Sequence, residues 1–177
     1  MRSYAPPPRL IVFGAIDVAA ELARIGVVLG YRVTVCDARP VFATARRFPQ
    51  AQEVVVDWPH RYLAAEAAAG RLNERTAVCV LTHDAKFDVP ALRLALDLEL
   101  GFVGAMGSRR THHDRLGRLR EAGVTEAALA RLSSPVGLDL GGRSAAETAV
   151  SIVAELVAVR NCRRGGRLRD ATGSIHG

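Results

Sequence analysis

The sequence predicts a single-domain α/β protein with a doubly wound parallel sheet, and three observations support this. Apolar runs rich in β-branched residues alternate along the chain with longer segments of helical period, which is the pattern of consecutive β-α-β units. The apolar runs do not alternate between polar and apolar residues, as expected of strands that helices cover on both faces. The 177 residues, 49% of them hydrophobic, suffice for one domain with a full core.

Short apolar runs bounded by turn residues are the expected strands. Each is followed by a segment of helical period, so right-handed crossovers leave a Rossmann-like strand order as the leading topology. The strands are expected at 10–14, 32–37, 53–57, 76–82 and 101–106.

The expected helices follow these strands, and two of them carry a clear N-terminal signal. Asp88 precedes a helix with Pro90 in its first turn, where the missing N–H of proline costs nothing. Ser144 and Glu147 form a capping box, in which side chains satisfy free backbone N–H groups at the helix start. The helices are expected at 17–29, 59–70, 88–99, 107–122, 125–132 and 144–160.

The two ends of the chain differ from this pattern. Residues 1–9 contain three consecutive prolines and resemble a linker that enters the first strand. The Rossmann-like domain is expected over 10–160, and a basic, glycine-rich tail over 161–177, disordered or peripheral. Without a long apolar run or an apolar segment at the N-terminus, the sequence predicts no membrane span and no signal peptide, and therefore a cytoplasmic protein.

Charge and cysteine content exclude other classes of protein. The net charge is +6, but the basic residues are mostly scattered and aromatic residues are few, which argues against a nucleic-acid surface. Cys36, Cys79 and Cys162 have no CxxC spacing, so we expect buried reduced thiols and no disulfide or zinc framework.

The first strand leads into a loop that resembles a dinucleotide-binding loop without its middle glycine. Gly14 supplies the tight turn and Ala19 the close helix packing, and Gly14 and Ala15 are candidate cofactor contacts. Ile16 stands where a glycine would let the backbone approach a pyrophosphate, and Asp17 repels an anion there. A turn kept only for packing is an equally good interpretation.

Candidate polar residues also follow the second strand. Asp37 ends that strand at the position of a ribose-binding carboxylate, with Arg39 two residues further. The two residues either hold a nucleotide sugar or form a surface ion pair, and the sequence favours neither.

The stretch THDAKFD, after the fourth strand, is dense in polar residues. We expect His83, Asp84 and Lys86 to face a cleft, where His83 would act as a general base or bond to a heterocycle. The alternative is a turn histidine bonded to backbone. No second histidine stands at ligand spacing, so no metal site is expected.

The stretch MGSRR, after the fifth strand, opens a helix. Arg109 and Arg110 lie in the first turn, where positive charge is unfavourable because of the helix dipole. An anion bound to Gly107, Ser108 and the guanidinium groups would reverse this energetic penalty. The sequence therefore favours a phosphate site here over a solvated arginine pair.

Five segments carry a family resemblance. They resemble, in order and spacing from Leu10 to Val157, the C-terminal Rossmann domain of the XdhC/CoxI family of accessory proteins for molybdenum hydroxylases. The segments are LIVFGAIDVAAELA, RVTVCDARPVFAT, VLTHDAKFDVPAL, FVGAMGSRRTHHDRL and SPVGLDLGGRSAAETAVSIVAEL.

The resemblance implies a binding protein more than an enzyme. Such a protein would bind the molybdenum cofactor, a phosphate-bearing pterin or its dinucleotide form, shield it during sulfuration and deliver it to an apo-hydroxylase. The implied partner is a molybdenum hydroxylase, and a cysteine desulfurase and a second copy of this chain are further suggested partners. The family's usual N-terminal domain is not recognised, so the chain is a fragment or a stand-alone half.

Two other functions stay open. One is an NAD(P)-dependent oxidoreductase that uses Asp37 or Arg39 on the ribose side, disfavoured by Ile16 and Asp17. The other is an interaction module that binds a hydroxylase without any cofactor.

Overall fold

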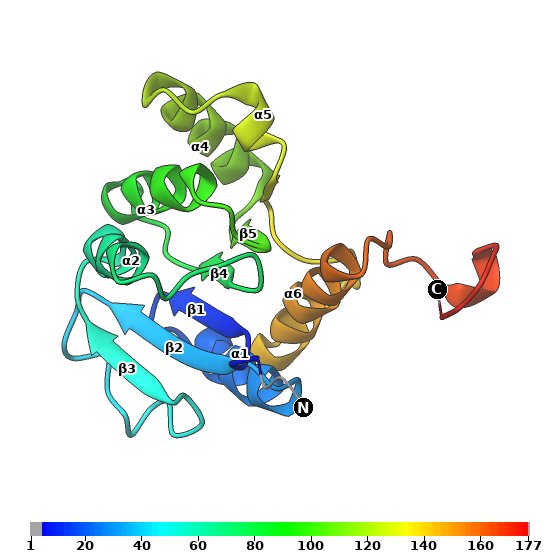
Figure 1. Ribbon diagram of the computed structural model, residues 1–177, viewed down its shortest axis with the longest axis horizontal. Helices are drawn as coiled ribbons and strands as arrows, with labels where there is room; N and C mark the ends of the chain where they lie inside the picture. Colours follow the sequence, from blue (N-terminus) through cyan, green and yellow to red (C-terminus); the bar gives the residue numbers. More distant parts are fainter. Residues whose placement is uncertain (1–4, 177) are drawn as a thin grey trace.

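The structure, a computed structural model, describes residues 5–176 and contains one parallel sheet (Figure 1). The strand order is β3-β2-β1-β4-β5-β6, and every neighbouring pair is parallel. This is the doubly wound Rossmann-like order, so the predicted fold class is confirmed. The strands are β1 (Arg9–Phe13), β2 (Arg32–Asp37), β3 (Glu53–Val56), β4 (Ala77–Val80), β5 (Phe102–Ala105) and β6 (Leu132–Ser133).

Helices cover both faces of the sheet. Helices α1 and α6 pack together on one face, and α2, α3 and α4 lie on the other (Figure 1). The helices are α1 (Asp17–Val28), α2 (Pro59–Ala68), α3 (Ala85–Asp97), α4 (Arg109–Glu121), α5 (Glu126–Leu129) and α6 (Ala145–Arg160), and a 3₁₀ turn spans Leu168–Asp170.

The continuous apolar strands reflect two separate cores. In β1, Leu10 and Val12 point into the core under α1 and α6, whereas Ile11 and Phe13 point into the core under α2 and α3. Because successive side chains alternate between two buried faces, every position of the strand is apolar or buried.

Two expected elements need correction near the end of the sheet. The helix expected at 125–132 ends early, because α5 covers only Glu126–Leu129 and the chain then forms β6. The two residues of β6 pair in parallel with β5. So short a strand leaves no pattern in the sequence.

The start of α3 also differs from the prediction. Its N-cap is Asp84, whose side chain accepts a hydrogen bond from the N–H of Lys86 at 2.9 Å. Asp88 lies inside the helix and is buried, with Pro90 after it. The carboxylate of Asp88 pairs with Arg115 on α4, and this tertiary contact removes it from any capping role.

The N-terminus of α6 agrees in part with the predicted capping box. Ser144 accepts a hydrogen bond from the N–H of Glu147 at 3.0 Å, as expected. The carboxylate of Glu147 reaches the N–H of Arg143 at 2.8 Å, one residue before the expected one.

The cysteines and the tail complete the fold. Cys36 and Cys79 are free and buried as predicted, but Cys162 is exposed, because it follows α6 where the chain leaves the core. Residues 161–176 are exposed throughout and extend away from the sheet (Figure 1). Over the described part of the chain, every helix is too short or too polar to span a membrane.

Candidate functional site

A large cleft lies at the carboxyl ends of the central strands. It has a volume of about 720 Å³ and is found where the strand order reverses between β1 and β4. This is the usual place for a ligand in an open parallel sheet. Its lining comprises Ile16, Asp37, Ala38, Arg39, Pro59, Leu81, Thr82, His83, Asp84, Ala85, Phe87 and Arg118.

The first loop contributes one side chain, that of Ile16, to the lining of the cleft. Gly14 has φ +116°, and a Cβ there would lie 3.2 Å from the backbone nitrogen of Thr82, so only glycine fits this turn. Ile16 lines the cleft at the position where a nucleotide-binding loop needs a small residue.

The carboxylate of Asp37 is fully used inside the protein. One oxygen accepts hydrogen bonds from the backbone N–H of Ala15 at 2.8 Å and from Arg39 Nη2 at 2.9 Å. The other accepts from the backbone N–H of Arg39 at 2.9 Å and from its Nε at 3.0 Å. Burial alone would raise the pKa of Asp37, but the hydrogen bonds from Arg39 and Ala15 lower it below the usual value. Asp37 and Arg39 thus form an ion pair, and a ligand role for either residue stays a prediction.

Arg47 holds the same loop from its other side, and no motif in the sequence indicates this role. Its Nη1 donates to the carbonyl oxygens of Ala15 and Phe42, both at 2.9 Å, and its Nη2 lies 3.8 Å from Asp17. The loop is therefore clamped at its N–H by Asp37 and at its carbonyl by Arg47.

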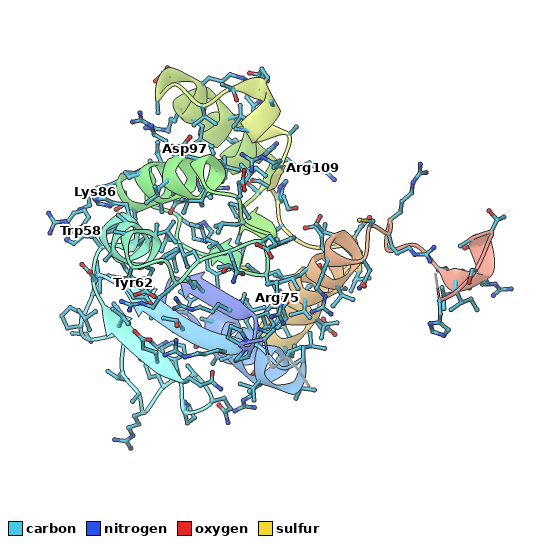
Figure 2. All side chains as sticks on the ribbon, in the orientation of Figure 1. Trp58, Tyr62, Arg75, Lys86, Asp97 and Arg109 are labelled. Atoms are coloured by element: carbon cyan, nitrogen blue, oxygen red, sulfur yellow. The ribbon has the colours of Figure 1, made fainter. Side chains whose placement is uncertain are left out.

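The polar stretch after β4 divides between the cleft and its rim. His83 and Asp84 line the cleft and are exposed. The Nζ of Lys86 lies outside the lining, 4.9 Å from the ring centroid of Phe87 and 5.2 Å from that of Trp58. The rings of Trp58 and Phe87 are 4.9 Å apart, and Figure 2 shows Lys86 and Trp58 side by side at the ends of α3 and α2. Phe87 thus brings an aromatic face to the cleft wall.

A second, smaller cleft of about 220 Å³ adjoins the first. His83, Ala85 and Arg118 belong to both linings. The other residues that line the small cleft are Asp88, Val89, Thr111, Asp114 and Arg115.

A buried ion pair forms one wall of the small cleft. Arg115 Nη2 lies 3.2 Å from Asp88 Oδ2 and also donates to the carbonyl of Met106 at 3.1 Å, while Nη1 donates to Ser134 at 3.2 Å. The hydroxyl of Thr82 donates to the same carboxylate of Asp88. Burial raises the pKa of Asp88 above its usual value, against the opposing effects of these donors.

The MGSRR stretch borders the small cleft without lining it. Ser108 is the N-cap of α4 and accepts a hydrogen bond from the N–H of Thr111 at 3.1 Å. Ser108, Arg109 and Arg110 are exposed, and with Gly107 they stand outside both linings. Figure 2 shows Arg109 well separated from Lys86 and Trp58. Ser108 nevertheless contacts Thr111, which lines the small cleft together with His83, so a shared site of the two predicted halves stays a prediction.

Sequence reasoning missed Arg118 and the contact between the rings of Trp58 and Phe87. The helical spacing of Thr111, Arg115 and Arg118 places them on one face of the helix predicted at 107–122, and this spacing is visible in the sequence. That this face meets the start of α3 depends on packing between distant segments.

The arrangement suits a small molecule. The large cleft offers apolar and aromatic surface with a few polar groups, the usual composition of a small-molecule site. Within residues 5–176, no group of three or more metal-ligating side chains is placed to hold a metal ion.

Comparison with known proteins identifies relatives of this chain. It is 31% identical over 155 residues to a probable xanthine dehydrogenase subunit from Bacillus subtilis, covering 88% of this chain and 44% of that protein. It is 28% identical over 157 residues to the molybdenum cofactor insertion chaperone PaoD of Escherichia coli, covering 89% of this chain and 42% of that protein. The chain thus spans less than half the length of these relatives.

A solved structure shows the same fold. The crystal structure of a xanthine dehydrogenase from Bacillus halodurans matches 95% of this chain and 46% of its own, with a TM-score of 0.74 and 30% identity. The family model of the XdhC Rossmann domain matches residues 10–156. The chain therefore belongs to the XdhC Rossmann domain family.

Proposed function

We propose that this chain binds the molybdenum cofactor and assists its maturation and insertion into a hydroxylase of the xanthine dehydrogenase type. The observation that carries the proposal is the cleft at the switch point of the sheet, whose volume of about 720 Å³ lies within the range of small-molecule sites. The name of the relative PaoD, a molybdenum cofactor insertion chaperone, supports the same function.

The residues of the cleft fit a pterin with a charged end. Ile16, Leu81 and Phe87 would contact the planar ring system, and His83 and Asp84 would hydrogen-bond to its polar edge. Asp37 and Arg39 would hold the loop rigid beneath the ligand, because their groups already bind each other and Ala15. When bound, the cofactor supplies the molybdenum chemistry, and the chain itself binds and shields it.

The proposal includes an apo-hydroxylase as the partner that receives the cofactor. A cysteine desulfurase and a second copy of this chain stay predictions as further partners. An anion site at residues 107–110 also stays a prediction, because both arginines are exposed at the start of α4. It is tested separately below.

The proposal is tested by titrating the purified chain with molybdenum cofactor released anaerobically from a molybdenum enzyme. Trp58, the only tryptophan, contacts Phe87 at the cleft wall, so its fluorescence should change on binding. We expect saturable binding, and transfer of the bound cofactor should activate an apo-hydroxylase.

Three other results would contradict the proposal. Tight binding of NAD(P) in calorimetry, with none of the pterin, would favour the oxidoreductase alternative. Capture of the hydroxylase with no dependence on cofactor would favour a pure interaction module. A lack of saturable binding would exclude the carrier function for this chain.

A further inference from the structure

The wall that the two clefts share suggests where the charged end of the ligand lies. We propose that Arg118 anchors the phosphate of the bound ligand at the junction of the clefts, with its planar part in the larger cleft. This inference rests on the proposed function and assigns the anion site to α4 Arg118 instead of to the first loop or to Arg109 and Arg110.

Arg118 is the cation at the cleft that has no partner within the described chain. Its neighbours along α4 are occupied, since Arg115 pairs with Asp88 and Arg120 Nε lies 2.7 Å from Glu126. Arg39, the other arginine that lines the large cleft, is held by Asp37. No hydrogen bond or ion pair within residues 5–176 engages the guanidinium of Arg118, although the carbonyl of this residue accepts from the N–H of Ala122 within the helix. The guanidinium is therefore free to bind an anion.

The usual anion position of this fold is unfavourable for an anion in this chain. In a nucleotide-binding loop the phosphate accepts backbone N–H groups at the start of the first helix. Here the N–H of Ala15 donates to Asp37, the bulky Ile16 stands at the N-cap and lines the cleft, and Asp17 adds a negative charge. A phosphate in the cleft must therefore find its positive charge on another element.

The shapes of the two clefts favour the same orientation. The larger one has room for a ring system, while the smaller one, at about 220 Å³, suits a compact group. The two spaces meet at His83, Ala85 and Arg118, so a ligand with a ring at one end and a phosphate at the other would pass this point. His83 is available there as a second donor to the phosphate.

Two carboxylates near this junction oppose an anion. Asp84 lines the large cleft and is partly used as the N-cap of α3. Asp114 lines the small cleft four residues before Arg118, which is the spacing of neighbours on one helix face. Removing the charge of Asp114 should therefore strengthen phosphate binding, whereas removing Arg118 should weaken it.

The test compares single variants by the fluorescence of Trp58 with the cofactor before and after treatment with phosphatase. We expect Arg118→Ala to weaken binding of the phosphorylated form about 10- to 100-fold, the usual effect of losing a charged hydrogen bond. Arg118→Lys should recover part of the loss, and Asp114→Asn should tighten binding. Binding of the dephosphorylated form should stay within about twofold of that of the parent protein.

The matched controls are Arg120→Ala, an exposed arginine of the same helix, and Arg109→Ala combined with Arg110→Ala. Unchanged affinity in both controls supports the assignment. A loss in the Arg109 and Arg110 double variant with none in Arg118→Ala would overturn it and return the phosphate to the start of α4. An equal loss for both forms of the cofactor would also overturn it, because the role would then be steric.

Failure of this inference differs from failure of the proposed function. If the parent protein binds the cofactor and Arg118→Ala binds it equally well, the function stands and the assignment falls. If the parent protein binds no cofactor, inorganic pyrophosphate serves as the second probe. Protection of the parent protein from urea unfolding by pyrophosphate, lost in Arg118→Ala, then supports the anion site alone, and equal protection of both contradicts it.

Discussion

The backbone N–H of Ala15 donates a hydrogen bond to the carboxylate of Asp37 across 2.8 Å, joining the loop after β1 to the end of β2. In a dinucleotide-binding loop these are the groups that a nucleotide would use. Here they satisfy each other, and Arg39 completes the coordination of the carboxylate. The loop is thus a structural joint in this chain.

Replacing Asp37 with asparagine should destabilise the protein by about 1–3 kcal/mol at neutral pH, because charged hydrogen bonds to a buried group are lost. The folded-state pKa of Asp37 is lowered, so its contribution is present above the ordinary aspartate value and is lost as the pH falls through the lowered one. The difference between parent and variant in urea unfolding should therefore shrink below about pH 4. The control is Asp97→Asn, at an exposed position, which should change little.

The pair of Asp88 and Arg115 should behave as a coupled unit. Arg115→Met should cost about 3–5 kcal/mol, because it leaves a buried carboxylate without its main partner. Adding Asp88→Asn to that variant should recover part of the loss. Urea unfolding of the two single variants and the double variant gives the coupling energy, and simple additivity would show that the pair contributes nothing specific.

Two helical glycines should respond to alanine in opposite ways. A Cβ at Gly26 on α1 would lie 2.9 Å from Val33 Cγ2 and 3.0 Å from Leu10 Cδ2, in the core against the sheet. We expect Gly26→Ala to lower the free energy of unfolding by up to about 2 kcal/mol, because overpacking outweighs the gain in helix propensity. Gly117 on α4 has nothing within 4 Å of such a Cβ, so Gly117→Ala should stabilise by about 0.5–1 kcal/mol. Thermal unfolding of both variants measures the contrast.

Thiol reactivity should separate the cysteines. Burial raises the pKa of Cys36 and of Cys79 to about 12, so neither forms a reactive thiolate at neutral pH. Cys162 is exposed beyond α6. A disulfide reagent should therefore modify Cys162 rapidly in the folded protein and the other two only after unfolding. Rapid reaction of the Cys162→Ser variant would contradict this burial.

The fold was readable from the sequence because its signals are local and repeated. Continuous apolar strands with helical segments between them require a parallel sheet covered on both faces. The bounds of each predicted strand agree with those in the structure to within a few residues. The failures have separate causes, since β6 is too short to leave a pattern and the start of α3 was placed at the wrong aspartate. Asp88 followed by Pro90 looks like a helix start, but Asp84 caps α3 four residues earlier, and Asp88 instead bonds to Arg115, 27 positions away.

The candidate site was readable in part. Strand ends directed attention to Asp37, His83 and Asp84, which all line the large cleft. The sequence left open whether Asp37 binds a ligand or Arg39, because that depends on the rotamers of both side chains. Arg118 lies far from any strand end in the sequence, and only the packing of α4 against α3 brings it to the cleft.

Two exposed side chains, those of His83 and Arg118, lie between the large cleft and the small cleft. Exposed side chains change rotamer within nanoseconds, whereas the sheet and the clamped loop beneath them keep their positions. A compact group can thus move from one cleft to the other without displacement of any strand or helix. Under the proposed function, rotation of these two side chains alone would therefore let a bound ligand shift between the clefts.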